Sequence, residues 1–204
     1  VIARPFEGSP GAFRRLGEAR HDYSLVTPER TVLDDLVAHG REVVGIGKIP
    51  DIYGHRGITA EVRSSSNLDG VERTLAAMRE RPDGLVFTNL VEFDSLYGHR
   101  RDPQGYAAAL RDVDDRLPDL LAATHPGDVL LFVSDHGNDP TWQGTDHTRE
   151  HGLLLAYAPG RPGTDLGTRE SFTDVGATVA DLLGVPWDGH GTSFAATLRD
   201  EGPG

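Results

Sequence analysis

The stretch DVLLFVSDHGNDPTWQGTDHTREHGLLLAY, residues 128–157, decides the fold class of this chain. Most of residues 128–134 are apolar, as expected of a strand buried on both faces of a sheet. Asp135 and His136 follow directly, and a long polar loop then leads to a second apolar run at 153–159. The stretch therefore predicts two strands joined by a polar loop, with two titratable side chains at the tip of the first strand.

Predicted strands and helices alternate in the rest of the chain. Short apolar runs rich in β-branched residues predict strands, and apolar residues at helical spacing predict helices. Two further strands are expected at 41–49 and 84–93, and helices are expected at 66–81, 102–123 and 171–184. Apolar strands that alternate with helices are typical of a parallel sheet covered by helices. The sequence thus predicts an α/β fold, a three-layer α/β/α sandwich with a largely parallel sheet.

Local signals mark where two of these helices begin and where one bends. Ser66 or Asn67 is expected to cap the helix that follows it. Asp102 stands directly before Pro103, a pair typical of a helix start, because the carboxylate accepts from free N–H groups and proline needs none. Pro118 is expected to kink the same helix.

Composition limits the classes of partner. The chain has 204 residues, a formal net charge of −12 and no cysteine. Binding to a nucleic-acid backbone depends on Lys and Arg, so we expect no nucleic-acid partner. No apolar run approaches the about 20 residues that a membrane span needs, and we expect no membrane partner. The absence of cysteine excludes disulfides and thiolate metal sites and favours a cytoplasmic protein.

Five candidate metal ligands follow the predicted strands. The strand at 84–93 leads into Asp94 and His99, the strand at 128–134 leads into Asp135 and His136, and the polar loop carries His147. In open α/β sheets, ligands bind outside the carboxyl ends of the strands. Taken singly, each of these residues is more often a turn, cap or surface residue. Their convergence at one edge favours a metal site, and carboxylate with imidazole suits Mn²⁺, Zn²⁺ or iron.

Other polar residues of the same loop are expected to support these ligands. Asp146, Arg149 and Glu150 lie next to His147 in sequence, and His151 follows them. Residues around metal ligands commonly orient them through hydrogen bonds. We therefore expect these four residues to have supporting or structural roles.

Five longer motifs stand out, namely SDHGNDPTWQGTDHTREH (134–151), FDSLYGHRRDPQGY (93–106), GIGKIPDIYGHRGIT (45–59), SNLDGVERTL (66–75) and RHDYSL (20–25). Together they closely resemble motifs of the phosphopentomutase family, within the alkaline phosphatase superfamily. The Asp-His-Gly strand end alone indicates only the superfamily, whereas its combination with the longer motifs indicates the family. The resemblance extends from VIARPF to GTSF, nearly the whole chain. It implies an alkaline phosphatase-like core, present here in part.

The resemblance also implies a chemistry. Members of the family interconvert ribose or deoxyribose 1-phosphate and 5-phosphate, with a sugar bisphosphate as primer and two Mn²⁺ ions per active site. By matching motifs, Asp94, His99 and His147 would hold one ion, and Asp135 and His136 would hold the other. An early aspartate and a phosphorylated threonine complete the family's site. Nothing in this sequence matches their motifs, so no catalytic nucleophile is assigned.

The same motifs suggest contacts to the substrate and a division of the chain. Lys48, Arg20 and Arg4 are expected to bind the sugar phosphate, although Lys48 taken alone would be an ordinary surface residue. Residues 1–22 resemble the end of a cap domain inserted into the core, and 23–204 resemble the C-terminal half of the metal-binding core. The chain begins at Val1 without an initiator methionine. We therefore expect a fragment whose N-terminal part is missing; the alternative is a chain shortened by a few residues.

Rival functions remain open at the level of sequence. Another enzyme of the same superfamily, such as a cofactor-independent phosphoglycerate mutase or a metal-dependent phosphatase, would use similar ligands. A non-catalytic metal-binding fragment is the rival from a different class, because the matched motifs supply ligands but no nucleophile.

Overall fold

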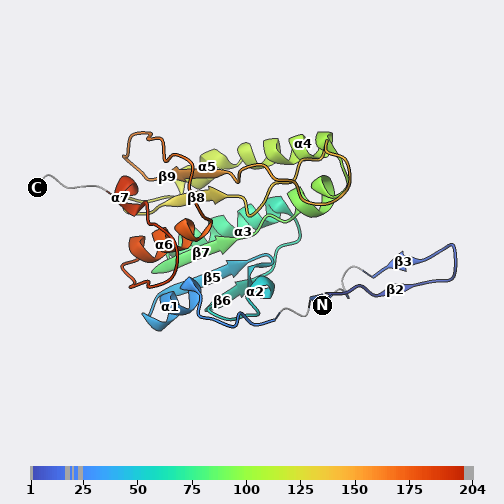
Figure 1. Cartoon of the computed structure of the whole chain (residues 1–204), viewed down its shortest axis with the longest axis horizontal. Coiled ribbons are helices and arrows are strands. Elements are labelled where there is room, and N and C mark those ends of the chain that lie inside the picture. Colours follow the sequence, from blue (N-terminus) through green and yellow to red (C-terminus); the bar gives the residue numbers. More distant parts are fainter. Residues whose placement is uncertain (1, 17–18, 20, 23–24, 200–204) are drawn as a thin grey trace, which may run out of the picture.

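The centre of the fold is a parallel sheet of three strands. The computed structural model describes residues 2–16, 19, 21–22 and 25–199. Its strands β5 (Glu42–Ile46), β6 (Ala60–Val62) and β7 (Gly84–Thr88) lie in the order β6-β5-β7, with all pairs parallel (Figure 1). Helices cover this sheet, so the predicted α/β fold with a parallel sheet is confirmed.

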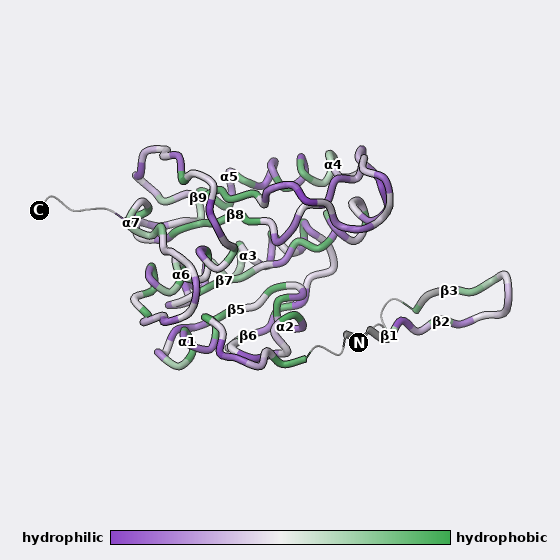
Figure 2. The backbone as a smooth tube through the Cα atoms, in the orientation of Figure 1, coloured by the Kyte–Doolittle hydropathy of each residue, from purple (hydrophilic) through white to green (hydrophobic). Residues whose placement is uncertain are grey.

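The last two strands form a separate antiparallel pair. β8 (Leu130–Val133) pairs with β9 (Leu154–Tyr157), so that Phe132 lies opposite Leu155. Figure 1 shows β8 pointing in the same direction as β7. Among the described strands, however, β8 is hydrogen-bonded to β9 alone. Figure 2 shows hydrophobic residues along β8 and a mostly hydrophilic loop after it, which matches the predicted strand followed by a polar loop.

Alternating side chains of β7 face two different layers of helices. Leu85 and Phe87 pack against a buried cluster that contains Leu33 and Leu36 of α1 (Val32–Ala38). The hydroxyl of Thr88, on the opposite face, lies 2.6 Å from the hydroxyl of Thr74 in α3 (Asn67–Glu80). Since successive side chains of a strand point to opposite faces, the sheet lies between two layers of helices.

Each helical layer has its own buried core. On the α1 side, Val43 and Val185 complete the cluster, and α6 (Thr173–Leu182) contributes Val179 to it. On the other side, Val71 and Leu75 of α3 pack with Leu120 of α5 (Leu117–Ala122). Leu130 and Phe132 of β8 pack against this second cluster. Helix α3 therefore packs against both sheets.

The predicted helix signals are confirmed. Ser66 caps α3, its hydroxyl accepting a hydrogen bond from Asp69 N at 3.1 Å. Asp102 caps α4 (Pro103–Asp114) by accepting from Gly105 N at 2.9 Å. The single helix expected at 102–123 is interrupted, because α5 begins as a new helix with Pro118 in its first turn.

Strand β7 is shorter than the apolar run that predicts it. It ends at Thr88, and a π-helical turn, η2 (Phe93–Gly98), follows. Glu92 N donates to Asn67 Oδ1 at 3.0 Å, and Asn67 N donates to Glu92 Oε2 at 2.6 Å. This reciprocal pair turns the chain toward α3, while Leu90 packs into the core beside α3. Asp94 thus lies in a helical turn and not at the strand tip itself.

Several short elements are not among those predicted from the sequence. They are β6, α1, α2 (Ile49–Ile52) and α7 (Ala195–Leu198). The N-terminal residues form small antiparallel ribbons, β1 (Ile2–Ala3) with β4 (His21–Asp22) and β2 (Phe6–Glu7) with β3 (Arg14–Arg15). The β2–β3 ribbon extends away from the helices and sheets (Figure 1). Its assignment to a cap domain stays a prediction. None of the helices in the described parts has the length and apolar character to cross a bilayer.

Open strand edges lead us to expect association of the isolated chain. Within the described ranges, β9 pairs only with β8, and Leu153, Leu155 and Phe172 are each more than half exposed. Unpaired edges with apolar side chains favour pairing between chains. We expect light scattering across a concentration series to detect oligomers, and Leu155→Lys to reduce their fraction. A dilute, stable monomer with a cooperative melting transition would contradict this expectation.

Candidate metal centre

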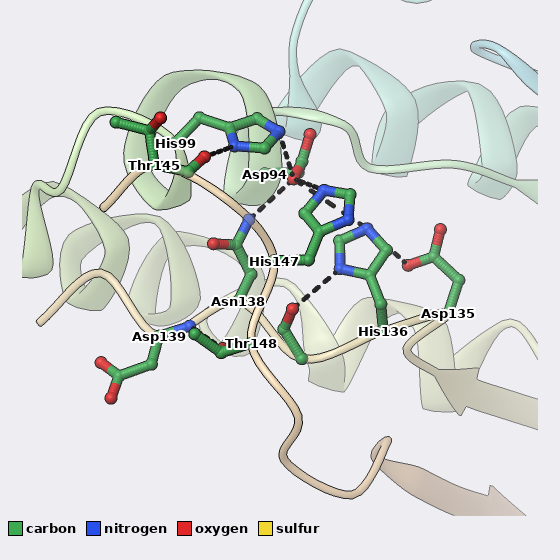
Figure 3. A network of polar contacts seen from close by, with 10 residues as sticks. Asp94, His99, Asp135, His136, Asn138, Asp139, Thr145, His147 and Thr148 are labelled. Carbon is green, nitrogen blue, oxygen red and sulfur yellow. Dashed lines mark hydrogen bonds and ion pairs between the residues drawn. The ribbon is translucent and has the colours of Figure 1, made fainter. Parts of the chain in front are cut away.

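All five predicted metal ligands lie together. Asp94 stands in the first turn of η2, and His99 follows its last residue. Asp135 and His136 come directly after β8, and His147 belongs to the loop that leads toward β9. Figure 3 shows the imidazoles gathered around the carboxylate of Asp94, with Asp135 on the far side of His136.

One carboxylate oxygen is the centre of the group. Asp94 Oδ1 lies 3.1 Å from His147 Nε2, 3.3 Å from His99 Nε2 and 3.9 Å from His136 Nε2. The rings of His136 and His147 are stacked, with centroids 3.6 Å apart, and those of His99 and His147 are 4.8 Å apart. Three imidazoles from different segments thus face the same oxygen.

Backbone carbonyls determine which ring nitrogens are available. His99 Nδ1 lies 2.5 Å from Thr145 O, and His136 Nδ1 lies 3.0 Å from Gly137 O. A carbonyl can only accept, so in each ring Nδ1 carries the hydrogen and a neutral ring keeps its lone pair on Nε2. Both lone pairs then face the carboxylate oxygen, and a bridging proton or cation would relieve their repulsion. This donor set fits a divalent transition-metal ion.

One group of three candidate ligands combines residues that follow β7, residues that follow β8 and the loop toward β9. One ligand atom each from Asp94, His136 and His147 lies within 4.8 Å of the others. Asp135 Oδ1 is 3.6 Å from His136 Nε2, and its side chain is 82% exposed. Asp135 can therefore take part in binding an ion on the open side of the cluster. The division of the five ligands between two ions stays a prediction.

Thr148 closes the loop that carries His147. Thr148 N donates to Gly137 O at 3.1 Å, and its hydroxyl accepts from Asp139 N at 2.7 Å. The same hydroxyl donates to the carboxylate of Glu150. A side chain at Gly137 would clash with Glu150, so the two arms of the loop pack closely. This closure keeps His147 stacked on His136.

The other loop residues differ in their contacts. Hydrogen bonds from the hydroxyl and the backbone N–H of Thr141 hold the pKa of Asp139 below its usual range, which keeps its carboxylate ionised. Glu150 accepts a hydrogen bond from Thr148, and its supporting role stays a prediction. Asp146, Arg149 and His151 are exposed, and their predicted supporting roles stay predictions.

The phenol of Tyr106 lies within the electrostatic influence of Asp94. Burial raises the pKa of its phenol, and the negative charge of Asp94 raises it further. Its ring lies 5.6 Å from that of Phe93, between centroids. The phenol is therefore neutral at ordinary pH.

The expected substrate contacts are less completely described. Lys48 lies two residues after β5, at the carboxyl edge of the parallel sheet. Asp94 follows β7 at the same edge. Arg4 is exposed in the N-terminal segment. Arg20 lies outside the described residues. Roles for all three in phosphate binding stay predictions.

Sequence reasoning did not find Thr148, Asn138 or the carbonyl of Thr145. Each of the three forms a hydrogen bond to a residue that is distant in sequence or that lies on the opposite arm of the loop. Their polar character in the loop is the only signal that the sequence carries.

Comparison with known proteins gives a consistent relationship. The family model described as the Metalloenzyme superfamily matches residues 17–187. The phosphopentomutase of Deinococcus radiodurans is 59% identical over 199 residues, which are 98% of this chain and 51% of that protein. Those of Anaeromyxobacter sp. (strain K) and Alkaliphilus metalliredigens are 56% and 47% identical, over 97% and 95% of this chain and 50% of each relative. The chain thus spans about half the length of these curated relatives.

The geometry predicts that Asp94 is the main determinant of metal retention. After incubation with Mn²⁺ and buffer exchange, we expect the unmodified chain to retain the ion and Asp94→Ala to lose most of it, because Asp94 Oδ1 faces all three imidazoles. Elemental analysis measures the retained metal. His125→Ala is the matched control, since His125 lies 3.5 Å from Asp128 in a separate ion pair. Equal retention by Asp94→Ala would show that the ion binds elsewhere.

Proposed function

This chain belongs to the Metalloenzyme superfamily, and on that premise we propose that it forms the metal-binding part of a phosphopentomutase. Such an enzyme interconverts the 1-phosphate and 5-phosphate of ribose or deoxyribose. The observation that carries the proposal is the convergence of three imidazoles on Asp94 Oδ1 in a chain that is 47–59% identical to the phosphopentomutases named above.

The proposed site would hold two divalent ions, and Mn²⁺ is the expected metal. Asp94, His99 and His147 would bind one ion, and Asp135 and His136 would bind the other. When bound about 3.5–4 Å apart, two such ions stabilise the attacking and leaving oxygens of a phosphoryl group in transfer. The protein's contribution is orientation, because the carbonyls of Thr145 and Gly137 fix the Nε2 atoms toward the site.

The ligands remain accessible to a phosphorylated sugar. The side chains of Asp94, His99 and His147 are between 32% and 46% exposed. We infer that phosphate approaches from this open side, where Asp135 also lies. Lys48, Arg4 and Arg20 would bind the phosphate groups, and an arginine can do so through two parallel hydrogen bonds.

The phosphate-accepting residue would come from outside these 204 residues. The family transfers phosphate through a threonine, and no threonine of this chain matches that motif. A covalent phosphothreonine would divide the isomerisation into two transfers, first from the sugar and then back to its other position. A sugar bisphosphate would supply the initial phosphate. The expected cytoplasmic location is part of this proposal.

The proposal predicts an activity for the complete gene product. With Mn²⁺ and a catalytic amount of sugar bisphosphate, it should interconvert ribose 1-phosphate and ribose 5-phosphate, followed by phosphorus NMR. Asp135→Asn should lower turnover about 100-fold or more, because it removes charge from a site that stabilises phosphoryl transfer. Lys48→Ala should cost less, about 10-fold, as expected for one charged hydrogen bond.

Three outcomes would contradict parts of this proposal. Conversion of phosphoglycerate would indicate a phosphoglycerate mutase, and release of free phosphate without isomerisation would indicate a phosphatase. Mutase activity from the 204-residue chain alone would show that one of its own residues accepts the phosphate.

A further inference from the structure

Asn138 contacts the oxygen on which the imidazoles converge. Asn138 Nδ2 lies 2.7 Å from Asp94 Oδ1, and the two residues are separated by 44 positions in the sequence. Figure 3 shows the carboxamide reaching from the loop after β8 to the carboxylate in η2. A carboxylate can only accept, so the amide nitrogen of Asn138 donates. This bond joins the two segments that carry the candidate ligands.

Gly98 provides the space in which the carboxamide lies. Gly98 is buried, and a Cβ atom added to it would clash with Cγ, Oδ1 and Nδ2 of Asn138. Gly98 does not have the positive φ that requires a glycine elsewhere in the chain. Its missing side chain therefore serves the contact with Asn138 and not a backbone turn. Gly98 and Asp94 belong to the same helical turn, so η2 supplies both the space and the acceptor.

The position of this bond suggests an effect on metal binding. Asp94 Oδ1 already faces three Nε2 atoms, and an unrestrained carboxylate could rotate to present either oxygen or neither. The bond from Asn138 restricts that rotation and leaves a lone pair of Oδ1 toward the imidazoles. An ion then binds a carboxylate that is already oriented, and less side-chain entropy is lost on binding.

We propose that Asn138, seated on Gly98, is a positioning residue that orients Asp94 for metal binding. The inference rests on the metal centre of the proposed function. It assigns no chemistry to Asn138 itself, which acts only through Asp94. A merely structural role, in which Asn138 anchors its loop, would instead affect the stability of the protein equally with and without metal.

The affinity of the folded chain for Mn²⁺ tests this role. Free Mn²⁺ is measured by electron paramagnetic resonance during titration of the chain. Asn138→Ala should weaken affinity about 10- to 100-fold, the usual effect of removing a residue that orients a ligand. The control is Gln143→Ala, which truncates an exposed amide in the same loop and should bind as the unmodified chain does.

Gly98→Ala provides an independent variant, because it displaces the carboxamide without removing it. It should weaken Mn²⁺ binding to a similar degree. The double variant should be no weaker than the weaker single variant, since both changes break the same bond. Full additivity of the two effects would overturn the proposed link between Gly98 and Asn138.

Thermal melting separates positioning from folding. The Asn138→Ala variant should melt near the unmodified chain without metal but gain less stability from Mn²⁺, as expected for weaker binding to the native state. If it melts early, Asn138→Leu replaces it, because leucine keeps the branched shape and lacks the donor. Unchanged Mn²⁺ affinity in both Asn138 variants would overturn this inference alone. No Mn²⁺ binding by the unmodified chain would instead contradict the metal centre and the proposed function.

Discussion

Three imidazole nitrogens and one amide nitrogen face a single carboxylate oxygen, Asp94 Oδ1. A cation or a proton would stabilise such a group, since two of the imidazoles are held with their lone pairs toward the anion. The surrounding structure brings these side chains together. Strand β8 positions His136, η2 positions Asp94 and His99, and the loop closed by Thr148 returns His147 to the other two rings.

The exposure of these side chains determines what the group can do. They are between 29% and 46% exposed, so the ligands keep contact with solvent and the loss of solvation on folding is limited. A structural metal site is usually closed by protein ligands, whereas a catalytic site keeps a position open. Asp135, which is almost fully exposed beside His136, lies at the open side. This exposure supports the proposed function, in which a phosphorylated sugar approaches the ligands.

Much of the fold and the ligand set could be predicted because both depend on local patterns. Apolar runs identified β5, β7, β8 and β9, and the caps at Ser66 and Asp102 are formed by residues within three positions. The end of β7 could not be predicted, because the bonds between Asn67 and Glu92 join residues 25 positions apart. The role of Asn138 could not be predicted for the same reason, because its partner Asp94 is 44 positions away. Ligand types were visible at the strand ends, but the contacts that orient them were not.

The apolar pattern of β9 wrongly predicts a strand that is buried on both faces. The run at 153–159 is as apolar as a strand buried on both faces, yet Leu155 and Tyr157 are partly exposed. Both lie on the face of Phe132 and Leu130, their partners in β8, which pack against the α3 core. Residues of α3 and α5 pack against Leu130 and Phe132 of β8 on this face. The contacts that gather the candidate ligands lie within the described residues, because each of the three imidazoles and the amide of Asn138 contacts Asp94 Oδ1.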